Sequence, residues 1–310
     1  MISLNQRAKI ITEKIIEEED SIGVNSFSLE NGTKVLDLGV EEDGGLKAGR
    51  YLSEACMSGL GEVNYTQDKR PKVHVTVDEP ALACMASQYA GWSIEVGDYS
   101  AMGSGPARAL AKVEDLFEEF DYEDPSGSGV LTLEGREFPD EEVSAYIAEK
   151  CNIDTDQLYL LVAPTASIVG SVQISARVVE AGIHKLHTLG FDMEKIISGN
   201  GSAPIAPIAD NDLVAMGKTN DCTLYGGRAI YYVDAEDSEI EEVIDDLPSC
   251  ASEDYGRPFL EIFEEYDRDF FEIDPNLFST AEITINNVNT GSVFKVGEVN
   301  EEVLEKSLGI

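Results

Sequence analysis

Basic residues are scarce in this chain of 310 residues, in which 22 Lys and Arg stand against 60 Asp and Glu for a net charge near −38 at pH 7. Surfaces that bind a phosphate backbone or anionic lipid are built from Lys and Arg, so this balance argues against a nucleic-acid or membrane partner. No apolar run reaches the roughly 20 residues of a membrane-spanning helix. The first twenty residues also lack the unbroken apolar stretch of a signal peptide. We therefore expect a cytoplasmic protein.

Cysteines and the familiar catalytic motifs are also few. The five cysteines (Cys56, Cys84, Cys151, Cys222 and Cys250) are odd in number, far apart and without a CxxC pair, so we expect free buried thiols. The chain has no Walker A motif, complete dinucleotide fingerprint, GxSxG elbow, HExxH or convincing EF-hand pattern. These absences give no support to a nucleotide, serine-nucleophile or metal mechanism.

The acidic residues suggest adaptation to salt. Self-repulsion on this scale destabilises a compact protein at ordinary ionic strength, whereas molar salt shortens the Debye length to about 3 Å and screens it. The acids are spread over helical segments along the whole chain rather than gathered at one place. This dispersion favours salt adaptation over the steering of a cationic ligand.

Two segments are poor in acids and are therefore candidates for core, subunit interface or active site. Residues 157–207 hold three acids (Glu180, Asp192 and Glu194) where the average predicts about 10, and residues 80–113 hold two. We look for the chemistry in these segments.

Hydrophobic periodicity predicts a mixed α+β chain. Two similar Gly-rich loops, at 101–109 and 198–207, suggest that it forms two α/β lobes. We expect helices near 5–19, 46–58, 80–90, 105–119, 139–150, 166–189, 237–246 and 258–266, and strands at 34–38, 72–77, 129–133, 158–163, 222–233, 281–288 and 292–296. The turn-rich segment 121–129 suggests a boundary between lobes 1–125 and 126–310, either of which could be discontinuous in sequence.

One polar row stands out on the expected helix 166–189. Gln173, Arg177, Glu180, His184 and His187 repeat at helical spacing beside an apolar stripe. Most such rows are solvated faces, and Arg with Glu three residues later is a common ion pair, but a solvated face in this chain should be acidic. Glu180 with Arg177 is therefore a candidate general acid or base. The two histidines lack a third ligand for zinc, and His74 on an expected strand is most simply structural.

Short Gly-rich segments provide further candidates for substrate binding. Gly103, Ser104 and Gly105 precede an expected helix, and Ser198, Gly199 and Gly201 form a similar segment in the other half. Such loops can present backbone amides to an anion, although most are only turns. Ser87, Gln88 and Tyr89, just before Trp92 in the acid-poor segment, complete the candidates. Trp92 could stack on a flat ligand or belong to the core.

Long motifs of this chain resemble those of a known family. They include LENGTKVLDLGV (29–40), ACMASQYAGWSI (83–94), AMGSGPARAL (101–110), LEGREFPDEEV (133–143), YLLVAPTASIVGSVQISARVVEAGIHKLHTLGFD (159–192), KIISGNGSAPIAPIA (195–209), AMGKTNDCTLYGGRAIYYV (215–233) and FSTAEITINNVNTGSVFKVGEVNEEVLEKS (278–307). The chain resembles archaeal methenyltetrahydromethanopterin cyclohydrolases over nearly its whole length. With the acidic composition, this suggests a halophilic archaeon as its source.

The resemblance implies a two-domain subunit with its substrate pocket between the domains, a homotrimer, and no metal or redox cofactor. It implies reversible hydrolysis of the N5,N10-methenyl bridge of a pterin carrier to the N5-formyl form. The family's catalytic carboxylate and arginine correspond to Glu180 and Arg177, while Gln173 is assigned to water or pterin from its place on the polar row alone.

Three alternatives remain open at this point. The carrier could be tetrahydromethanopterin, its glutamylated relative sarcinapterin, or a folate. The chain could also be a pterin- or phosphate-binding protein of the same fold without catalysis, although both Arg177 and Glu180 are present. A phosphoryl-transfer enzyme is disfavoured because the Lys expected after a phosphate loop is missing.

Overall fold

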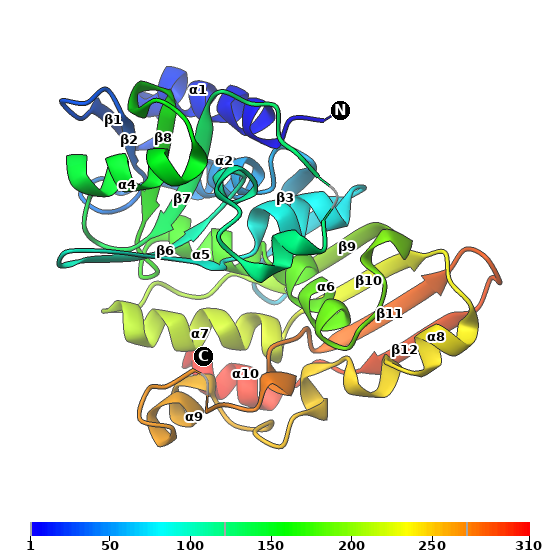
Figure 1. Cartoon of the computed structure of the whole chain (residues 1–310). Coiled ribbons are helices and arrows are strands. Elements are labelled where there is room, and N and C mark those ends of the chain that lie inside the picture. The colour runs from blue at the N-terminus through cyan, green and yellow to red at the C-terminus, as the bar shows by residue number, and fades with distance from the viewer. Residues whose placement is uncertain (1, 121, 271) are drawn as a thin grey trace. The chain divides into compact units, whose positions relative to one another are not determined.

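The computed structural model describes residues 2–120, 122–270 and 272–310 and confirms the expected mixture of helices and strands. The chain forms two compact units, each with a six-stranded sheet (Figure 1). Unit 1 comprises Met1–Gly61 and Leu82–Gln173, and unit 2 comprises Glu62–Ala81 and Ile174–Ile310. The division expected near residue 125 stays a prediction; in the structure the chain passes between units near residues 61, 81 and 173.

The sheet of unit 1 is parallel at its centre and antiparallel at its sides. Its strand order is β1 (Asn25–Ser28), β2 (Lys34–Asp37), β8 (Leu158–Ala163), β7 (Gly129–Glu134), β6 (Tyr99–Ser104) and β5 (Trp92–Val96). β2, β8 and β7 run parallel, while β1, β6 and β5 pair antiparallel with their neighbours. The expected strands at 34–38, 129–133 and 158–163 are therefore confirmed.

Helices cover both faces of this sheet, which explains the continuous apolar runs of its central strands. On β8, Leu161 lies in a core with residues of α1 (Leu4–Ile22) and α2 (Leu46–Cys56), whereas Leu160 lies in a second core with residues of α4 (Glu141–Cys151). The remaining helices of unit 1 are a π-helix (Ala81–Gln88), α3 (Ala107–Ala111), α5 (Ile168–Ser175) and 3-10 turns at Asp115–Glu118 and Thr155–Gln157.

The sheet of unit 2 has the order β12 (Val293–Gly297), β11 (Glu282–Asn287), β10 (Arg228–Val233), β9 (Ile196–Pro204), β4 (Pro71–Val77) and β3 (Gly61–Gln67). β10 and β11 are parallel, and β9 pairs antiparallel with both β10 and β4. Helix α6 (Val178–Thr188) packs on β9, β10 and β4 (Figure 1). This packing places the start of α6 against the middle of the sheet.

Unit 2 also has an aromatic core, which includes residues of helix α7 (Asp212–Leu224). Phe259 and Phe263 of α9 (Phe259–Glu265) pack there with Leu304 of α10 (Glu301–Leu308). The other helical segments are α8 (Asp237–Glu241) and 3-10 turns at Met193–Lys195, Ile244–Asp246, Ser249–Ala251 and Pro275–Leu277. Within the described parts of the chain, no helix has the length and apolar character needed to span a membrane.

Several expected elements differ from the structure. The helix expected over 166–189 is two helices, α5 and α6, separated by a turn at residues 176–177. The helix expected over 105–119 ends at Ala111, and the one expected over 80–90 has π geometry. The strand expected over 222–233 begins only at Arg228, because residues 222–224 end helix α7. The pattern did not predict strands β1, β3, β5, β6 and β9 or helices α7 and α10.

Candidate active site

Glu180 is unusual among the acids because it is buried. Among the residues that the structure describes, the buried carboxylates are Asp37, Asp221, Asp254 and Glu180, so Glu180 is the one glutamate. Each of the three aspartates accepts a backbone N–H hydrogen bond. Glu180 faces the guanidinium of Arg177, with 4.0 Å between Oε2 and Nη1 and side chains only 8% and 13% exposed. A buried carboxylate thus lies beside a largely buried guanidinium.

The chain geometry at the break between helices positions this pair. Arg177 is the N-cap of α6 and Glu180 lies in its first turn, where the helix dipole favours a negative charge. The Thr280 hydroxyl donates to the Val178 carbonyl at 2.9 Å, and the Tyr231 hydroxyl donates to the Val179 carbonyl at 2.8 Å. Hydrogen bonds from Thr280 and Tyr231 thus fix the two backbone carbonyls that come just before Glu180.

The segment around Gly199 is a strand, which corrects the expected loop. Gly199 and Gly201 lie in β9 and pair with residues of β10 on one side and β4 on the other. A side chain at Gly199 would place its Cβ 2.7 Å from Val179, and at Gly201 it would lie 3.0 Å from Val178 and Val179. The glycines therefore allow α6 to approach the sheet. Since a central strand commits its backbone amides to the ladder, an anion cradle is not formed there.

The remaining candidate of this segment, Ser198, lies on the other face of β9. The Ser198 hydroxyl donates to Val77 O at 3.1 Å and to Asp78 at 2.9 Å. His74 on β4 contacts the Asn200 amide at 3.0 Å, in keeping with a structural role. Contact of Ser198, Gly199 and Gly201 with substrate stays a prediction.

In unit 1, the segment Gly103–Gly105 is also more ordered than a loop. Gly103 and Ser104 end strand β6, and Gly105, with φ +101°, donates its N–H to Ser87 O at 2.8 Å. Ser104 is buried, with its hydroxyl 3.3 Å from the Cys56 sulfur. The helix that follows, α3, spans only five residues. The expected long helix with an anion-binding start is therefore absent from this described segment.

The candidates Ser87 and Tyr89 contact an arginine that the sequence patterns did not single out. Arg108 is fully buried and donates to the carbonyl of Ser87 at 3.0 Å and to Glu114 at 2.5 and 2.8 Å. Its guanidinium lies 5.2 Å from the centre of the Tyr89 ring. Ser87 and Gln88 are themselves buried. Arg108 therefore contacts both Ser87 and Tyr89. Contact of Ser87, Gln88 and Tyr89 with substrate stays a prediction.

A second carboxylate missed by the sequence patterns lies beside Gln173. Glu134, the last residue of β7, accepts hydrogen bonds from the Thr165 hydroxyl at 2.5 Å and from the Gln173 amide at 3.1 Å. Gln173 belongs to α5 in unit 1, whereas Arg177 and Glu180 belong to unit 2. The prediction that these residues form one polar row on a single helix is therefore wrong. The signal available in the sequence was the position of Glu134 directly after the expected apolar strand 129–133.

His184 and His187 lie further along α6. Burial lowers the pKa of His184 to about 4, and the neighbouring His187 and Lys185 act in the same direction. A histidine with this pKa is neutral at pH 7. His184 would therefore supply no positive charge near the pair.

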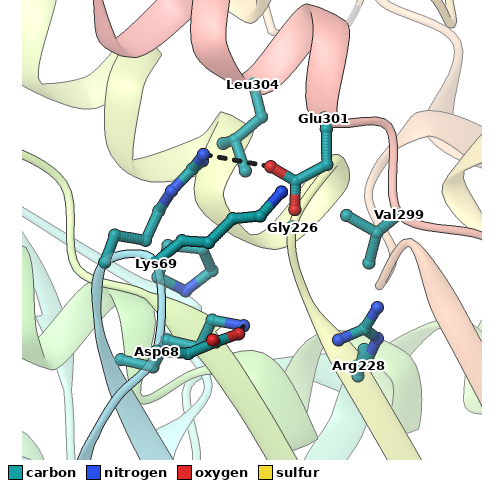
Figure 2. A pocket seen from close by; sticks show the side chains of 10 residues that line it. Asp68, Lys69, Gly226, Arg228, Val299, Glu301 and Leu304 are labelled. Carbon is teal, nitrogen blue, oxygen red and sulfur yellow. Dashed lines mark hydrogen bonds and ion pairs between the residues drawn. The ribbon is translucent and has the colours of Figure 1, made fainter. Parts of the chain in front are cut away.

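One small pocket of unit 2 lies away from all of these residues (Figure 2). It has room for about one water molecule. Its lining consists of Asp68, Lys69, Arg70, Lys72, Pro204, Gly226, Arg228, Val299, Glu301 and Leu304. Glu301 of α10 pairs with Arg70 at 3.0 Å, and Lys72 lies 3.9 Å from Asp68. Opposite charges thus meet within the pocket, which contains none of the candidate residues.

Comparison with known proteins shows the family of the chain. A family model described as Cyclohydrolase (MCH) matches residues 3–308. The methenyltetrahydromethanopterin cyclohydrolase of Methanocaldococcus jannaschii is 47% identical over 319 residues, covering 100% of this chain and 99% of its own. Those of Methanothermobacter marburgensis and Methanococcoides burtonii are 46% and 45% identical, covering 100% of this chain and 100% and 99% of their own. The chain therefore belongs to the methenyltetrahydromethanopterin cyclohydrolase family.

Proposed function

We propose that this protein reversibly hydrolyses N5,N10-methenyltetrahydromethanopterin to N5-formyltetrahydromethanopterin, with Glu180 as the general acid and base. The observation that carries the proposal is the buried Glu180 beside Arg177, in a chain otherwise covered with exposed acids. Membership of the cyclohydrolase family supports the reaction and the pterin substrate.

The substrate is already activated, which explains why one carboxylate could suffice. The bridge carbon belongs to a cationic amidinium and is electrophilic. Glu180 takes a proton from the attacking water as the new C–O bond forms, and then returns that proton to N10 as the C–N10 bond breaks. The hydroxyl of the former water loses its proton to solvent, which leaves the formyl group on N5. General acid-base catalysis of this kind contributes roughly 10²- to 10⁴-fold.

Arg177 would orient the carboxylate and favour its ionised form. The pair is separated by 4.0 Å, so the guanidinium acts mainly through its charge rather than through a tight hydrogen bond. Its removal should therefore reduce the rate without abolishing it. We assign Gln173 to contact with the attacking water or with the pterin.

The test is the loss of the methenyl chromophore when the purified protein, in molar potassium chloride, meets methenyltetrahydromethanopterin. Glu180→Gln should lower kcat by about 10²- to 10⁴-fold, and Arg177→Gln should lower it by less. Glu194→Gln removes the same charge at an exposed position and should retain full activity. Equal activity of Glu180→Gln and Glu194→Gln would overturn the assignment.

The same assay separates the other candidates. Turnover of methenyltetrahydrofolate at a comparable rate would favour a folate carrier, whereas binding without turnover by the wild type would favour a binding protein. We further propose that the enzyme works in the cytoplasm of a halophilic archaeon without a metal or cofactor. The net charge of −38 supports the salt adaptation. Activity that falls as potassium chloride is raised to molar levels would contradict it.

We also propose a homotrimer, because buried interfaces shed charge and the segment 80–113 holds few acids. Light scattering across salt concentrations tests the assembly. A fully active monomer at molar salt would refute it.

A further inference from the structure

The small pocket of Figure 2 is built entirely from residues of unit 2. Its lining residues come from the turn before β4, from strands β4, β9 and β10 and the residues beside them, and from helix α10. The cavity has a volume of about 10 Å³. An occupant must therefore be about as small as one water molecule or one monatomic ion.

The lining of this pocket is basic, in contrast with the chain as a whole. Arg228 pairs with Glu282, which lies outside the lining, at 3.4 Å. The chain has 22 basic residues against 60 acidic ones, whereas the lining has four basic residues against two acidic ones, namely Lys69, Arg70, Lys72 and Arg228 against Asp68 and Glu301. The pocket is therefore a place where a small anion meets an excess of positive charge.

Two of the basic side chains lie deeper than the carboxylates that pair with them. The Arg70 side chain is 10% exposed, while its partners Glu301 and Glu305 are 44% and 52% exposed. The Lys72 side chain is 18% exposed and that of its partner Asp68 is 76% exposed. Molar salt screens exposed charges strongly and buried charges much less. At high salt the exposed carboxylates therefore neutralise the pocket only in part.

Arg70 has a buried donor that needs an acceptor. Its Nη2 lies 3.0 Å from the carboxylate of Glu301. Its Nη1 is buried and has no hydrogen-bond partner within the described ranges of the chain. A guanidinium group only donates hydrogen bonds, and a buried donor of a charged group is costly to leave unpaired. Arg70 therefore favours the binding of a small acceptor.

The apolar lining residues limit the size of that acceptor. A Cβ at Gly226 would lie 2.9 Å from a side-chain carbon of Pro204 and 2.9 Å from one of Leu304. These three residues are thus already closely packed. A polyatomic anion such as sulfate or phosphate is too large for a cavity with room for about one water molecule.

We infer that this pocket binds a single chloride ion, which accepts a hydrogen bond from Nη1 of Arg70. Chloride is monatomic and accepts hydrogen bonds without donating any. Its negative charge is attracted by the basic lining, whereas a neutral water molecule gains no such attraction. An ion held there would stabilise the folded state of unit 2. The inference does not depend on the proposed hydrolysis.

Urea unfolding at constant potassium concentration, with glutamate replacing chloride, tests the inference. A ligand that binds only the folded state lowers the unfolding constant by at most about tenfold for each tenfold rise in its concentration. Raising chloride from about 0.1 to about 1 M should lower the unfolding constant of the wild type about 3- to 10-fold more than that of Arg70→Gln. Arg257→Gln makes the same change at another arginine that pairs with two acids, and should respond to chloride as the wild type does.

Glu301→Gln separates chloride binding from simple loss of the Arg70–Glu301 pair. Both Arg70→Gln and Glu301→Gln break this pair, but Glu301→Gln makes the lining more positive. It should therefore shift the chloride response to lower concentrations, whereas Arg70→Gln should abolish it. Equal chloride responses of the wild type and Arg70→Gln, or a loss of the response in Glu301→Gln as well, would overturn the inference.

Bromide gives a second readout that does not depend on stability. In crystals of the wild type soaked in potassium bromide, anomalous diffraction should show a bromide ion beside Nη1 of Arg70. The same soak of Arg70→Gln crystals should show none in the pocket. Bromide only at other places on the wild type would mean that the pocket holds water, and would also overturn the inference.

Discussion

Replacing Asp221 by asparagine should stabilise the protein at alkaline pH. Asp221 lies fully buried on α7, where its carboxylate accepts hydrogen bonds from Phe259 N at 2.9 Å and from the Ser307 hydroxyl at 2.5 Å. Burial raises the pKa of Asp221 from 3.8 to about 7, and the two hydrogen bonds only partly oppose this. Asparagine can accept from Phe259 and donate to Ser307, so the substitution removes the charge and keeps both contacts.

The sign and size of the effect follow from proton linkage. Between pH 4 and pH 7 the native state keeps the proton of Asp221, while the unfolded state has lost it. The contribution of Asp221 is therefore fully present below pH 3.8 and is lost as the pH rises through about 7. The loss is about 1.4 kcal/mol per pH unit, or about 4 kcal/mol over three units.

Urea unfolding at a series of pH values from 5 to 9, at constant high salt, measures this difference. Circular dichroism is the suitable signal, because the single tryptophan, Trp92, belongs to unit 1 and Asp221 to unit 2. The free energy of unfolding of Asp221→Asn minus that of the wild type should rise with pH and level off above pH 7. The exposed Glu264→Gln should show no such trend. A difference that is independent of pH would refute the reasoning.

Three further predictions concern helix α6. Gly182→Ala places a Cβ 2.2 Å from the Tyr231 hydroxyl oxygen and should lower the free energy of unfolding by about 1–3 kcal/mol. Gly127→Ala, with no atom within 4 Å, should be neutral in the same urea assay. Tyr231→Phe removes the hydroxyl that donates to Val179 O, so it should lower the free energy of unfolding by about 1 kcal/mol. Because this hydrogen bond holds the backbone before Glu180, the substitution should also lower kcat more than it changes KM. An unchanged kcat would contradict this role of Tyr231. Because burial lowers the pKa of His184 to about 4, the NMR titration of its ring should have a midpoint near pH 4. The contribution of His184 to the free energy of unfolding should fall as the pH drops from 6.5 to 4. A titration midpoint near pH 6.5 would contradict this lowered pKa.

The sequence predicted best those parts of the structure that leave a clear pattern in a short stretch of residues. Strand β8 is an uninterrupted apolar run because helices cover both faces of its sheet. Glu180 stood out because acids are rare in the surrounding segment, and in the structure it is the buried glutamate of the described chain. The scarcity of acids was informative because exposed positions elsewhere in the chain are so often acidic.

The parts that could not be predicted depend on contacts distant in sequence. The break between α5 and α6 contains no Gly or Pro; Ser175 just before it donates to Pro204 O at 2.8 Å, in another element. Gly199 and Gly201 suggested a loop, but they are small because Val178 and Val179 pack on them. Pairing of Glu134 with Gln173 likewise joins residues 39 positions apart.

The strand order of unit 2 has a consequence for how the chain folds during synthesis. β4 ends at Val77, but its partner β9 begins only at Ile196, after all of residues 82–173 of unit 1 have been made. At about 5–20 residues per second, a ribosome needs roughly 6–24 s to supply that partner. Unit 1 can therefore collapse first, while the segment of β3 and β4 waits with an unpaired edge. The high negative charge of the chain would oppose association of such incompletely folded polypeptides, because like charges repel one another.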